Sequence, residues 1–518
     1  MTTKLKSIKN IIEKNKAEAI LIVLGSIFYM FMMLYRLTYS PLWFDEYIER
    51  IISQMSLKSN EMYSNIIITF QPPLYNFLMH FWLKVSTGIL WFRLFNIIPG
   101  IITGLCLYLS IRKLYGYKAS FLSIILLSLC YQYIYCVQEC SEYQLMVMFA
   151  ALTMYFYIKY SFSKSRLDAF LFILWAVCAM YSQYGAMFIV IPFLSVFYIK
   201  TLISKDFKKI TYLTALYGIA LFAAAVPLYV LYASKQLKEN AIAEHTTVNF
   251  GISELLSLFT KPGHILGYLY NIPVNVFTEI VLGVVGVLFI VLSIYIALYK
   301  FHRLYASTNK NTTDSIVFDL IIILLIGYVL HYFLVVFHIY AMVHPGQSGG
   351  FFARYSYFYI PLVITVFVII CMEMKRLTLD EWINNKCNSI VTLCVITAIV
   401  TICFAPGIMK NWHKAYDDIF AETWVENHGW EQPTYLIGQA KYGFDFFIKD
   451  VYGDAAAANA FHESQLDTGY MPEAFWLWRT DWGGDNFDLF VNEAKSQGYN
   501  VEILYDYGLT GQLAHVTR

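Results

Sequence analysis

The chain has 518 residues, of which 58% are hydrophobic, 18% aromatic and only 14% charged, and its mean hydropathy is +0.53. Soluble globular domains carry about a quarter charged residues, so this composition excludes an ordinary soluble protein and indicates a chain with many membrane spans. The formal net charge of +1 gives no reason to expect a nucleic-acid partner.

The first apolar segment, residues 17–36, follows a lysine-rich start. It has the length of a membrane-spanning helix and lacks a small-residue cleavage pattern, so we expect an uncleaved anchor rather than a signal peptide. Ten more apolar segments bring the expected number of spans to about 11. They cover residues 91–111, 118–137, 144–160, 168–183, 185–200, 210–232, 273–299, 316–338, 355–373 and 389–406.

Basic residues alternate along the chain in the way that membrane topology requires. If the N-terminus is cytoplasmic, six inner segments hold 21 of the 37 Lys and Arg residues: 4–16, 112–118, 159–166, 200–209, 300–310 and 375–386. The short outer turns 138–143 and 181–185 hold none. The only Asn-x-Ser/Thr site, at 311–313, lies inside, which favours a bacterial plasma membrane over a secretory-pathway membrane.

This topology leaves four longer stretches on the outer face: 37–90, 233–272, 339–354 and 407–518. The first contains an apolar run that "QPP" interrupts at residues 71–73. Counting this run as a span would invert every later loop, so we expect helices that lie in the outer membrane interface.

The tail from residue 407 is polar and has no cysteine. Residues 434–438 and 499–507 are strand-like, and residues 485–498 are typical of a helix closed by Gly498. The sequence therefore predicts an all-α polytopic membrane domain over residues 1–406, with the first outer loop at 37–90. A small extracytoplasmic α/β domain follows at 407–518.

An acidic pair, Asp45 and Glu46, stands in "PLWFDEYIER" just past the first span. Ionised groups beside a membrane are costly unless they are solvated or functional. The simple alternative is a pair of loop charges that face water or pair with Arg50. On a helix, Asp45 and Glu49 would share a face.

Two further outer segments offer polar groups. In "QPPLYNF", Gln71 supplies a donor and an acceptor next to an extended backbone, although the prolines also suit a helix start. In "VQECSEYQL", Glu139 and Glu142 occupy a very short turn, where they either function or are solvated.

The last outer segment brings a cation. Arg354 and Tyr355 follow a glycine-rich loop at the outer end of a span. A guanidinium stays charged and binds phosphate in a fork, although an interfacial Arg that only snorkels is the alternative. His331, His338 and His344 lie near the same end, where they bind metal or phosphate or are ordinary interfacial histidines.

In combination, these segments resemble the GT-C fold glycosyltransferases, especially the branch with protein O-mannosyltransferases and the lipid A aminoarabinose transferase. The matching order is an anchor, "DE" at 45–46, "QPPLYNFLMHFW", the span at 91–116 with Arg93 at its entry, "QECSEYQL" and "FFARYSYFYIPLV". The resemblance covers residues 15–405. Two departures are Ser141, where relatives carry an Arg, and the neutral Gln71 before the proline pair.

The resemblance implies an inverting transfer of a sugar from a polyprenyl-phosphate carrier to an acceptor hydroxyl on the outer face. It assigns Asp45 as general base, with Glu46 beside it and Glu139 orienting the acceptor or a metal. Arg354, Tyr355 and Arg93 would bind the donor phosphate. The residues expected around the sugar and acceptor are Gln71, Tyr75, Glu142, Tyr143, Gln183, Tyr184 and His344.

The expected partners are a polyprenyl-phosphate-linked sugar, a glycan, glycolipid or protein acceptor, and the lipid bilayer. No cofactor is required by the pattern and no metal ligands are assigned, although Asp45 and Glu139 could share a divalent ion. Two other classes stay open. A flippase of a lipid-linked glycan would place charges within the spans, and a membrane-anchored binding protein would not need eleven spans.

Overall fold

A computed structural model of the chain describes residues 2–35, 37–38, 44–58, 60–69, 71–203, 207–239, 252–270, 272, 275–306, 311–336, 354–378, 417–438, 440–449, 452–480, 486–506 and 511–518. The chain divides into two compact units. The first comprises residues 1–35 and 52–408, and the second comprises residues 36–51 and 409–518.

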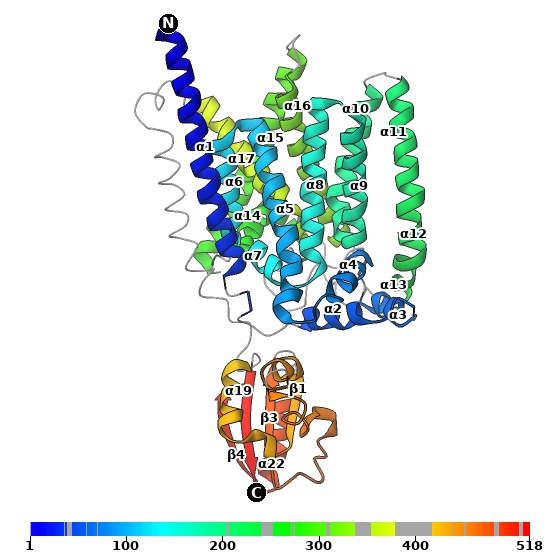
Figure 1. The fold of residues 1–518 in the computed structure, drawn as a ribbon, viewed down its shortest axis with the longest axis vertical. Helices are drawn as coiled ribbons and strands as arrows, with labels where there is room; N and C mark the ends of the chain where they lie inside the picture. The colour runs from blue at the N-terminus through cyan, green and yellow to red at the C-terminus, as the bar shows by residue number, and fades with distance from the viewer. Residues whose placement is uncertain are drawn as a thin grey trace. The chain divides into compact units, whose positions relative to one another are not determined.

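The first unit is a bundle of long apolar helices (Figure 1). Its main helices are α1 (Thr2–Leu34), α5 (Ile89–Tyr115), α6 (Tyr117–Leu129), α7 (Tyr131–Gln138), α8 (Glu142–Ser163), α9 (Arg166–Ser182), α10 (Met187–Ile203), α11 (Phe207–Ala220), α14 (Ile252–Leu269), α15 (Val276–Ala306), α16 (Thr312–Val336) and α17 (Ile360–Thr378). Two π-helical turns, η2 (Leu221–Ala225) and η3 (Tyr229–Ala233), and the short α12 (Val226–Leu228) between them connect α11 to α13 (Ser234–Glu239).

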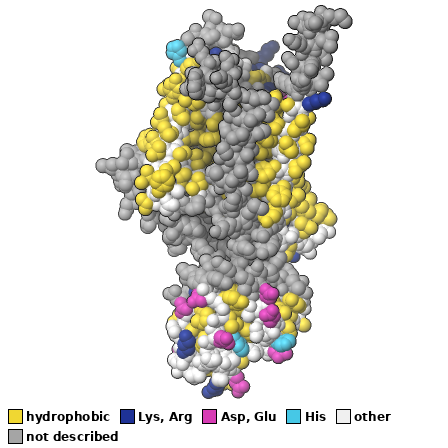
Figure 2. Space-filling model, turned by 90° about the vertical axis from the view of Figure 1, so that its left-hand side faces the viewer, with side chains coloured by type: hydrophobic (Ala, Val, Ile, Leu, Met, Phe, Trp, Pro, Cys, Tyr) yellow, Lys and Arg dark blue, Asp and Glu magenta, His cyan; other side chains and the backbone are white. Residues whose placement is uncertain are grey.

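Among the described residues, seven helical segments are long and apolar enough to cross a membrane, or eight if the bent pair α6–α7 counts as one span. Ten of the eleven predicted spans fall on helices, and the eleventh, 389–406, lies outside the described residues. Figure 2 shows hydrophobic side chains over much of the visible described surface of this unit. On α15, for example, Val276 and Phe277 are 76% and 74% exposed, as expected of side chains that face lipid.

In the stretch 37–90, predicted to be outer, the described residues form three short helices, α2 (Phe44–Gln54), α3 (Asn60–Ile68) and α4 (Leu74–Leu83). The last turn of α2 is tied to α4, because His80 Nδ1 lies 2.9 Å from the carbonyl oxygen of Ser53. The turn from α4 to α5 is closed by Trp82 and Trp91, whose rings stack at 4.2 Å and whose indole N–H groups donate to each other's carbonyls. Helices α3, α4 and α13 lie at the end of the bundle where α5 begins (Figure 1).

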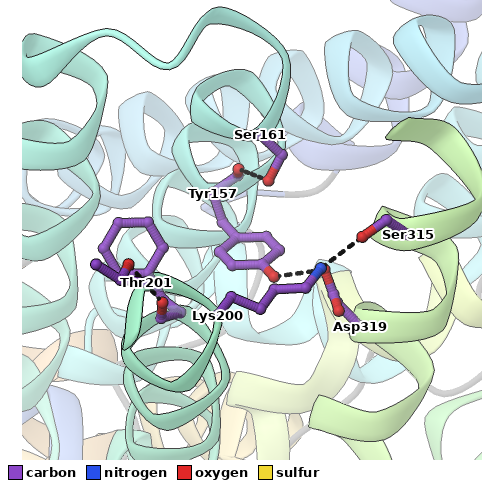
Figure 3. Close-up of polar contacts among 7 residues, drawn as sticks. Tyr157, Ser161, Lys200, Thr201, Ser315 and Asp319 are labelled. Carbon is purple, nitrogen blue, oxygen red and sulfur yellow. Dashed lines mark hydrogen bonds and ion pairs between the residues drawn. The ribbon is translucent and has the colours of Figure 1, made fainter. Parts of the chain in front are cut away.

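Charged side chains in the spans are paired near helix ends. Lys200 of α10 binds Asp319 of α16, which also accepts a hydrogen bond of 2.7 Å from the hydroxyl of Tyr157 on α8 (Figure 3). The fully buried Lys300 binds Asp314 and Glu373, each at 2.7 Å. Burying an ion costs several kcal/mol unless it is paired, so these contacts join five helices, α8, α10, α15, α16 and α17, at defined positions.

Helices α14 and α15 approach each other through glycines. A Cβ atom on Gly263 would lie 1.6 Å from the carbonyl oxygen of Leu282, and one on Gly286 would lie 2.5 Å from the carbonyl oxygen of Thr260. Small residues allow helix backbones to pack this closely in membranes. The predicted outer stretch 233–272 therefore contains a helix that packs along its neighbour.

The C-terminal part of the second unit is a small α/β fold. Its five strands are β1 (Thr434–Gly438), β2 (Ala460–His462), β3 (Ala474–Thr480), β4 (Asn500–Asp506) and β5 (Gly511–Thr517), in the order β2-β1-β3-β5-β4. Strand β1 is parallel to β2 and β3, whereas β5 is antiparallel to β3 and β4. Helix α22 (Asn486–Ser496) ends near Gly498, which has a φ of +85°.

Alternate residues of strand β3 pack into two different hydrophobic clusters. Phe475 and Leu477 pack in a cluster with Phe487 and Val491 of α22. Trp476 and Trp478 pack in the other cluster, which includes residues of α19 (Asp417–Glu426) and α20 (Ala440–Phe444). The fold class predicted from the sequence, a helical membrane domain followed by a small α/β domain, is confirmed.

Candidate active site around the turn between α7 and α8

The turn between α7 and α8 carries two buried acids. Helix α7 is bent by 67° from α6 and ends at Gln138, and α8 begins at Glu142. Between them Glu139 has an extended backbone. Glu139 and Glu142 are only 4% and 1% exposed, which does not fit solvated loop charges. Glu142 lies in the first turn of α8, where the helix dipole stabilises a negative charge.

Helix α5 holds this turn in place. The side-chain amide of Asn96 donates to the carbonyl oxygens of Glu139 at 2.5 Å and Ser141 at 3.2 Å. The thiol of Cys140 donates to the carbonyl oxygen of Phe92 at 3.0 Å. Arg93 is 2% exposed and lies one turn before Asn96 on the same face of α5. The buried cation Arg93 therefore lies on α5, and the buried acids Glu139 and Glu142 lie at the α7–α8 turn that hydrogen bonds join to α5.

The same turn is joined to the end of the first span. The side-chain amide of Gln138 donates to the carbonyl oxygens of Met33 at 3.1 Å and Tyr35 at 2.8 Å. Met33 lies in the last turn of α1 and Tyr35 directly follows the helix, in the region where helix carbonyls lack the N–H donors of a following turn. Gln138 therefore caps α1 from a segment far along the chain.

The segment with the predicted phosphate ligands packs beside this turn. It forms η6 (Arg354–Tyr359), which contacts α7, α8 and η1 (Tyr184–Ala186). The hydroxyl of Tyr357 donates to Gln132 of α7 at 2.7 Å, and its ring meets that of Tyr143 edge-on at 5.8 Å. The backbone of η6 is thus fixed against the first turn of α8.

Gln71 and Tyr184 are joined through a residue of α13. Gln236 donates to the carbonyl oxygen of Gln71 at 2.8 Å and accepts a hydrogen bond of 2.6 Å from the hydroxyl of Tyr184. The side chain of Gln183 caps η1 by accepting from the N–H of Gly185. Gln71 and its two prolines lead directly into α4, with Pro73 at the N-cap, so "QPP" stands at a helix start.

Tyr75, on α4, is buried and packs edge-on against Phe95 of α5 at 5.6 Å. Asp45 and Glu46 lie in the first turn of α2, and both Glu46 and Glu49, one turn further along, are buried. The side chains of Asp45, Arg354 and Tyr355 lie outside the described set, and so does all of His344.

Among the described residues, no three His, Cys, Asp or Glu side chains gather as a metal site. The ring of His331 stacks on Phe188 at 4.1 Å, so it is packed among aromatic residues. His338, its expected partner, lies outside the described residues.

Asn96 and Gln236 are among the polar residues at this end that were not predicted. Both act on backbone groups that are distant in sequence, so no local pattern marks them. The only available signal for Asn96 is that it lies three residues after Arg93 in an otherwise apolar span.

Comparison with protein families gives one match. Residues 70–229 match the family described as dolichyl-phosphate-mannose-protein mannosyltransferase. This segment, about a third of the chain, includes α4, α5, the α7–α8 turn and η1. Comparison with curated protein sequences gives no match.

Three solved structures illustrate the likeness in architecture. The chain is similar to apo ArnT from Cupriavidus metallidurans, with 10% identity, a TM-score of 0.44 and coverage of 97% of this chain and 98% of that one. For ArnT bound to undecaprenyl phosphate the identity is 10% and the TM-score 0.41, with coverage of 96% of this chain and 97% of that one. For an Archaeoglobus fulgidus oligosaccharyltransferase in complex with Zn and sulfate the identity is 10% and the TM-score 0.44, with coverage of 85% of this chain and 62% of that one. With TM-scores below 0.5, these likenesses do not assign a function to the chain.

The family match confirms the resemblance predicted from the sequence, and it falls on the segments that build the buried turn. The chain is a multi-pass membrane protein, and its residues 70–229 match the dolichyl-phosphate-mannose-protein mannosyltransferase family.

Proposed function

We propose that the protein is an inverting glycosyltransferase that moves a sugar from a polyprenyl-phosphate donor to an acceptor hydroxyl on the outer face of the plasma membrane. The observation that carries this proposal is the family match over residues 70–229. The matched segment contains Arg93, Glu139 and Glu142, and these residues lie on elements that α5 holds together.

In the proposed reaction the carboxylate of Asp45 accepts the proton of the acceptor hydroxyl. The acceptor oxygen forms a bond to the anomeric carbon as the bond from that carbon to the phosphate oxygen breaks, so the configuration inverts. Polyprenyl phosphate leaves as an anion and needs cationic stabilisation rather than a proton.

The remaining residues hold the two substrates. Arg354, Tyr355 and Arg93 bind the phosphate, and Glu139 orients the acceptor. The sugar and the acceptor lie among Gln71, Tyr75, Glu142, Tyr143, Gln183, Tyr184 and His344. Glu46 is the alternative base. The acceptor is a glycan, a glycolipid or a protein.

A transfer assay with the purified full-length protein in liposomes tests this function. The donors are polyprenyl-phosphate sugars, and released polyprenyl phosphate and glycosylated acceptor are both measured. Asp45→Asn is expected to slow transfer by about 10² to 10⁴-fold, the usual contribution of a general base. Asp488→Asn, at an exposed position of α22, is the matched control and should transfer normally.

Two outcomes would separate the alternatives. If Asp45→Asn transfers the sugar at the wild-type rate and Glu46→Gln does not transfer it, the general base is Glu46 instead. Passage of a lipid-linked glycan across the bilayer without any release of polyprenyl phosphate would support a flippase. The described charges in the spans that form salt bridges lie near helix ends, which favours the transferase.

A further inference from the structure

A cavity of about 390 Å³ lies at the other end of α5, away from the α7–α8 turn. It is lined by Glu18 of α1, Arg112 and Lys113 of α5, Tyr117 of α6 and Tyr155 of α8. Asn96 and Arg112 are 16 residues apart on α5, which corresponds to about 24 Å along a helix. The cavity is therefore separate from the candidate active site, and its size is in the range of small-ligand pockets.

The charged residues that line the cavity, Glu18, Arg112 and Lys113, together carry one net positive charge. Arg112 Nε forms an ion pair of 2.6 Å with Glu18 Oε1. Lys113 lies over the ring of Phe162 at 4.7 Å and interacts electrostatically with Asp168, whose carboxylate already forms an ion pair of 2.9 Å with Lys159. The hydroxyls of Tyr117 and Tyr155 add two hydrogen-bond donors. This combination is complementary to a phosphate that is singly charged and has several acceptor oxygens.

The position of the cavity along the helices points to a lipid. Glu18 lies in the first turn of the span Lys16–Leu34, and Lys113 lies in the last turn of the span Ile89–Tyr115. The cavity is thus at the depth of the lipid headgroups, where tyrosines are favoured. Further into the membrane the same two helices expose apolar side chains, such as Ile20 on α1 and Leu105 on α5. The basic segments here are those that charge alternation assigns to the inner face.

We propose that this cavity binds the phosphate headgroup of an anionic phospholipid from the inner leaflet, with Lys113 and Arg112 holding the phosphate. The acyl chains would follow the exposed apolar surface of α1 and α5. Basic pockets between membrane helices on the cytoplasmic side are suited to such headgroups. This inference does not depend on the proposed transferase activity.

Lipid retention by the purified full-length protein tests the proposal. Phosphatidylglycerol or phosphatidylcholine is added to the detergent-solubilised protein, and bound lipid is measured by native mass spectrometry. Lys113→Gln is expected to weaken retention of phosphatidylglycerol by about fivefold. Glu18→Gln should strengthen it by a similar factor, because it removes the carboxylate and leaves two positive charges. Lys118→Gln is the matched control, since Lys118 does not line the cavity, and should retain the lipid normally.

Lys113→Arg keeps the charge and should retain the lipid, so the Lys113 pair decides the question even if Glu18→Gln does not fold. Equal retention of phosphatidylglycerol by the wild type, Lys113→Gln and Glu18→Gln would overturn the proposal. Retention of phosphatidylcholine by the wild type as strongly as phosphatidylglycerol would overturn it as well. Displacement of phosphatidylglycerol by millimolar inorganic phosphate would show a soluble-anion site instead.

Discussion

The side-chain amide of Asn96 lies within hydrogen-bond distance of two carbonyl oxygens, those of Glu139 and Ser141, on either side of Cys140. A single side chain of α5 thus fixes the backbone of the turn that carries the buried acids. Because the hydrogen bonds are to main-chain atoms, they set the position of the turn whatever side chains it bears.

Asn96→Ala is expected to slow transfer by about tenfold or more, because a small displacement of catalytic groups lowers the rate steeply. The buried carbonyl of Ser141 would lose this donor, at a cost of about 1–3 kcal/mol, whereas the carbonyl of Glu139 keeps the N–H of Ser141 at 3.0 Å. The initial rate and the thermal midpoint of the purified protein should both fall.

Asn65→Ala is the control for this variant. Asn65 is half-buried and its amide donates to the carbonyl of Glu61 in its own helix and to the sulfur of Met55, away from the α7–α8 turn, so the rate of transfer should stay near wild type. Transfer at the normal rate by Asn96→Ala would show that the turn does not need this support.

A Gly→Ala change in the contact between α14 and α15 should have the opposite effect on stability from a Gly→Ala change in open space. Gly263→Ala forces the helices apart, because the new Cβ would overlap the carbonyl oxygen of Leu282, and overpacking of this kind typically costs about 1–3 kcal/mol. Gly218 of α11 has no atom within 4 Å of a new Cβ, so Gly218→Ala should stabilise the helix by about 0.5–1 kcal/mol. Thermal unfolding in detergent measures both, and a normal midpoint for Gly263→Ala would contradict the close contact.

The Lys200–Asp319 ion pair predicts a non-additive mutant cycle. Asp319→Ala removes the acceptor of both Lys200 and the Tyr157 hydroxyl, so the thermal midpoint should fall by several degrees. Lys200→Met leaves the carboxylate of Asp319, whose side chain is 1% exposed, without its cation and should lower the midpoint as well. In the double variant Lys200→Met/Asp319→Ala the buried carboxylate is gone too, so the loss should be smaller than the sum of the two single losses. A double variant that is as unstable as the sum of the singles would show that the two side chains act independently.

His515 predicts a pH dependence in the C-terminal fold. Burial lowers the pKa of His515, and Glu502 opposes this effect. Its ring stacks on Trp476 at 4.5 Å and Nε2 lies 2.7 Å from Gln432 Oε1. The unfolded state therefore binds a proton more readily, and the stability contributed by neutral His515 is lost as the pH falls below about 6.5.

Hydrogen exchange of β5 in the full-length protein measures this effect between pH 5 and 8. After correction for intrinsic exchange, protection should decrease toward pH 5 in the wild type and less so in His515→Gln. His428→Gln, outside the sheet, should behave as the wild type. An identical pH dependence in His515→Gln would assign the effect to other groups.

Much of this fold could be predicted because single-residue properties determine it. Long apolar runs marked the spans, and the proline pair marked the start of α4. Strand β1 matched its predicted residues, and Gly498 marked the end of α22. Strand β3 was missed because both of its faces are buried, with Phe475 and Trp476 in different clusters, so it lacks the alternation of a half-exposed strand.

The candidate site was less predictable, because its geometry depends on hydrogen bonds between elements that are distant in the sequence. Acids and cations at the outer ends of spans identified Glu139 and Arg93. Asn96 and Gln236 act through hydrogen bonds to backbone groups of other elements, and such bonds depend on helix packing that composition does not encode. Helix α14 was missed for a related reason, since its contact with α15 relies on glycines rather than on a strong apolar run.

The cap that Gln138 places on α1 bears on how the protein is made. During synthesis the first span is complete when Tyr35 has emerged, yet the donor for its last carbonyl appears 103 residues later. Until then that end of the anchor must be satisfied by water or lipid headgroups. The anchor and the α7–α8 turn thus reach their final form in the same assembly step, so a chain interrupted before residue 138 would carry an inserted but unfinished first helix.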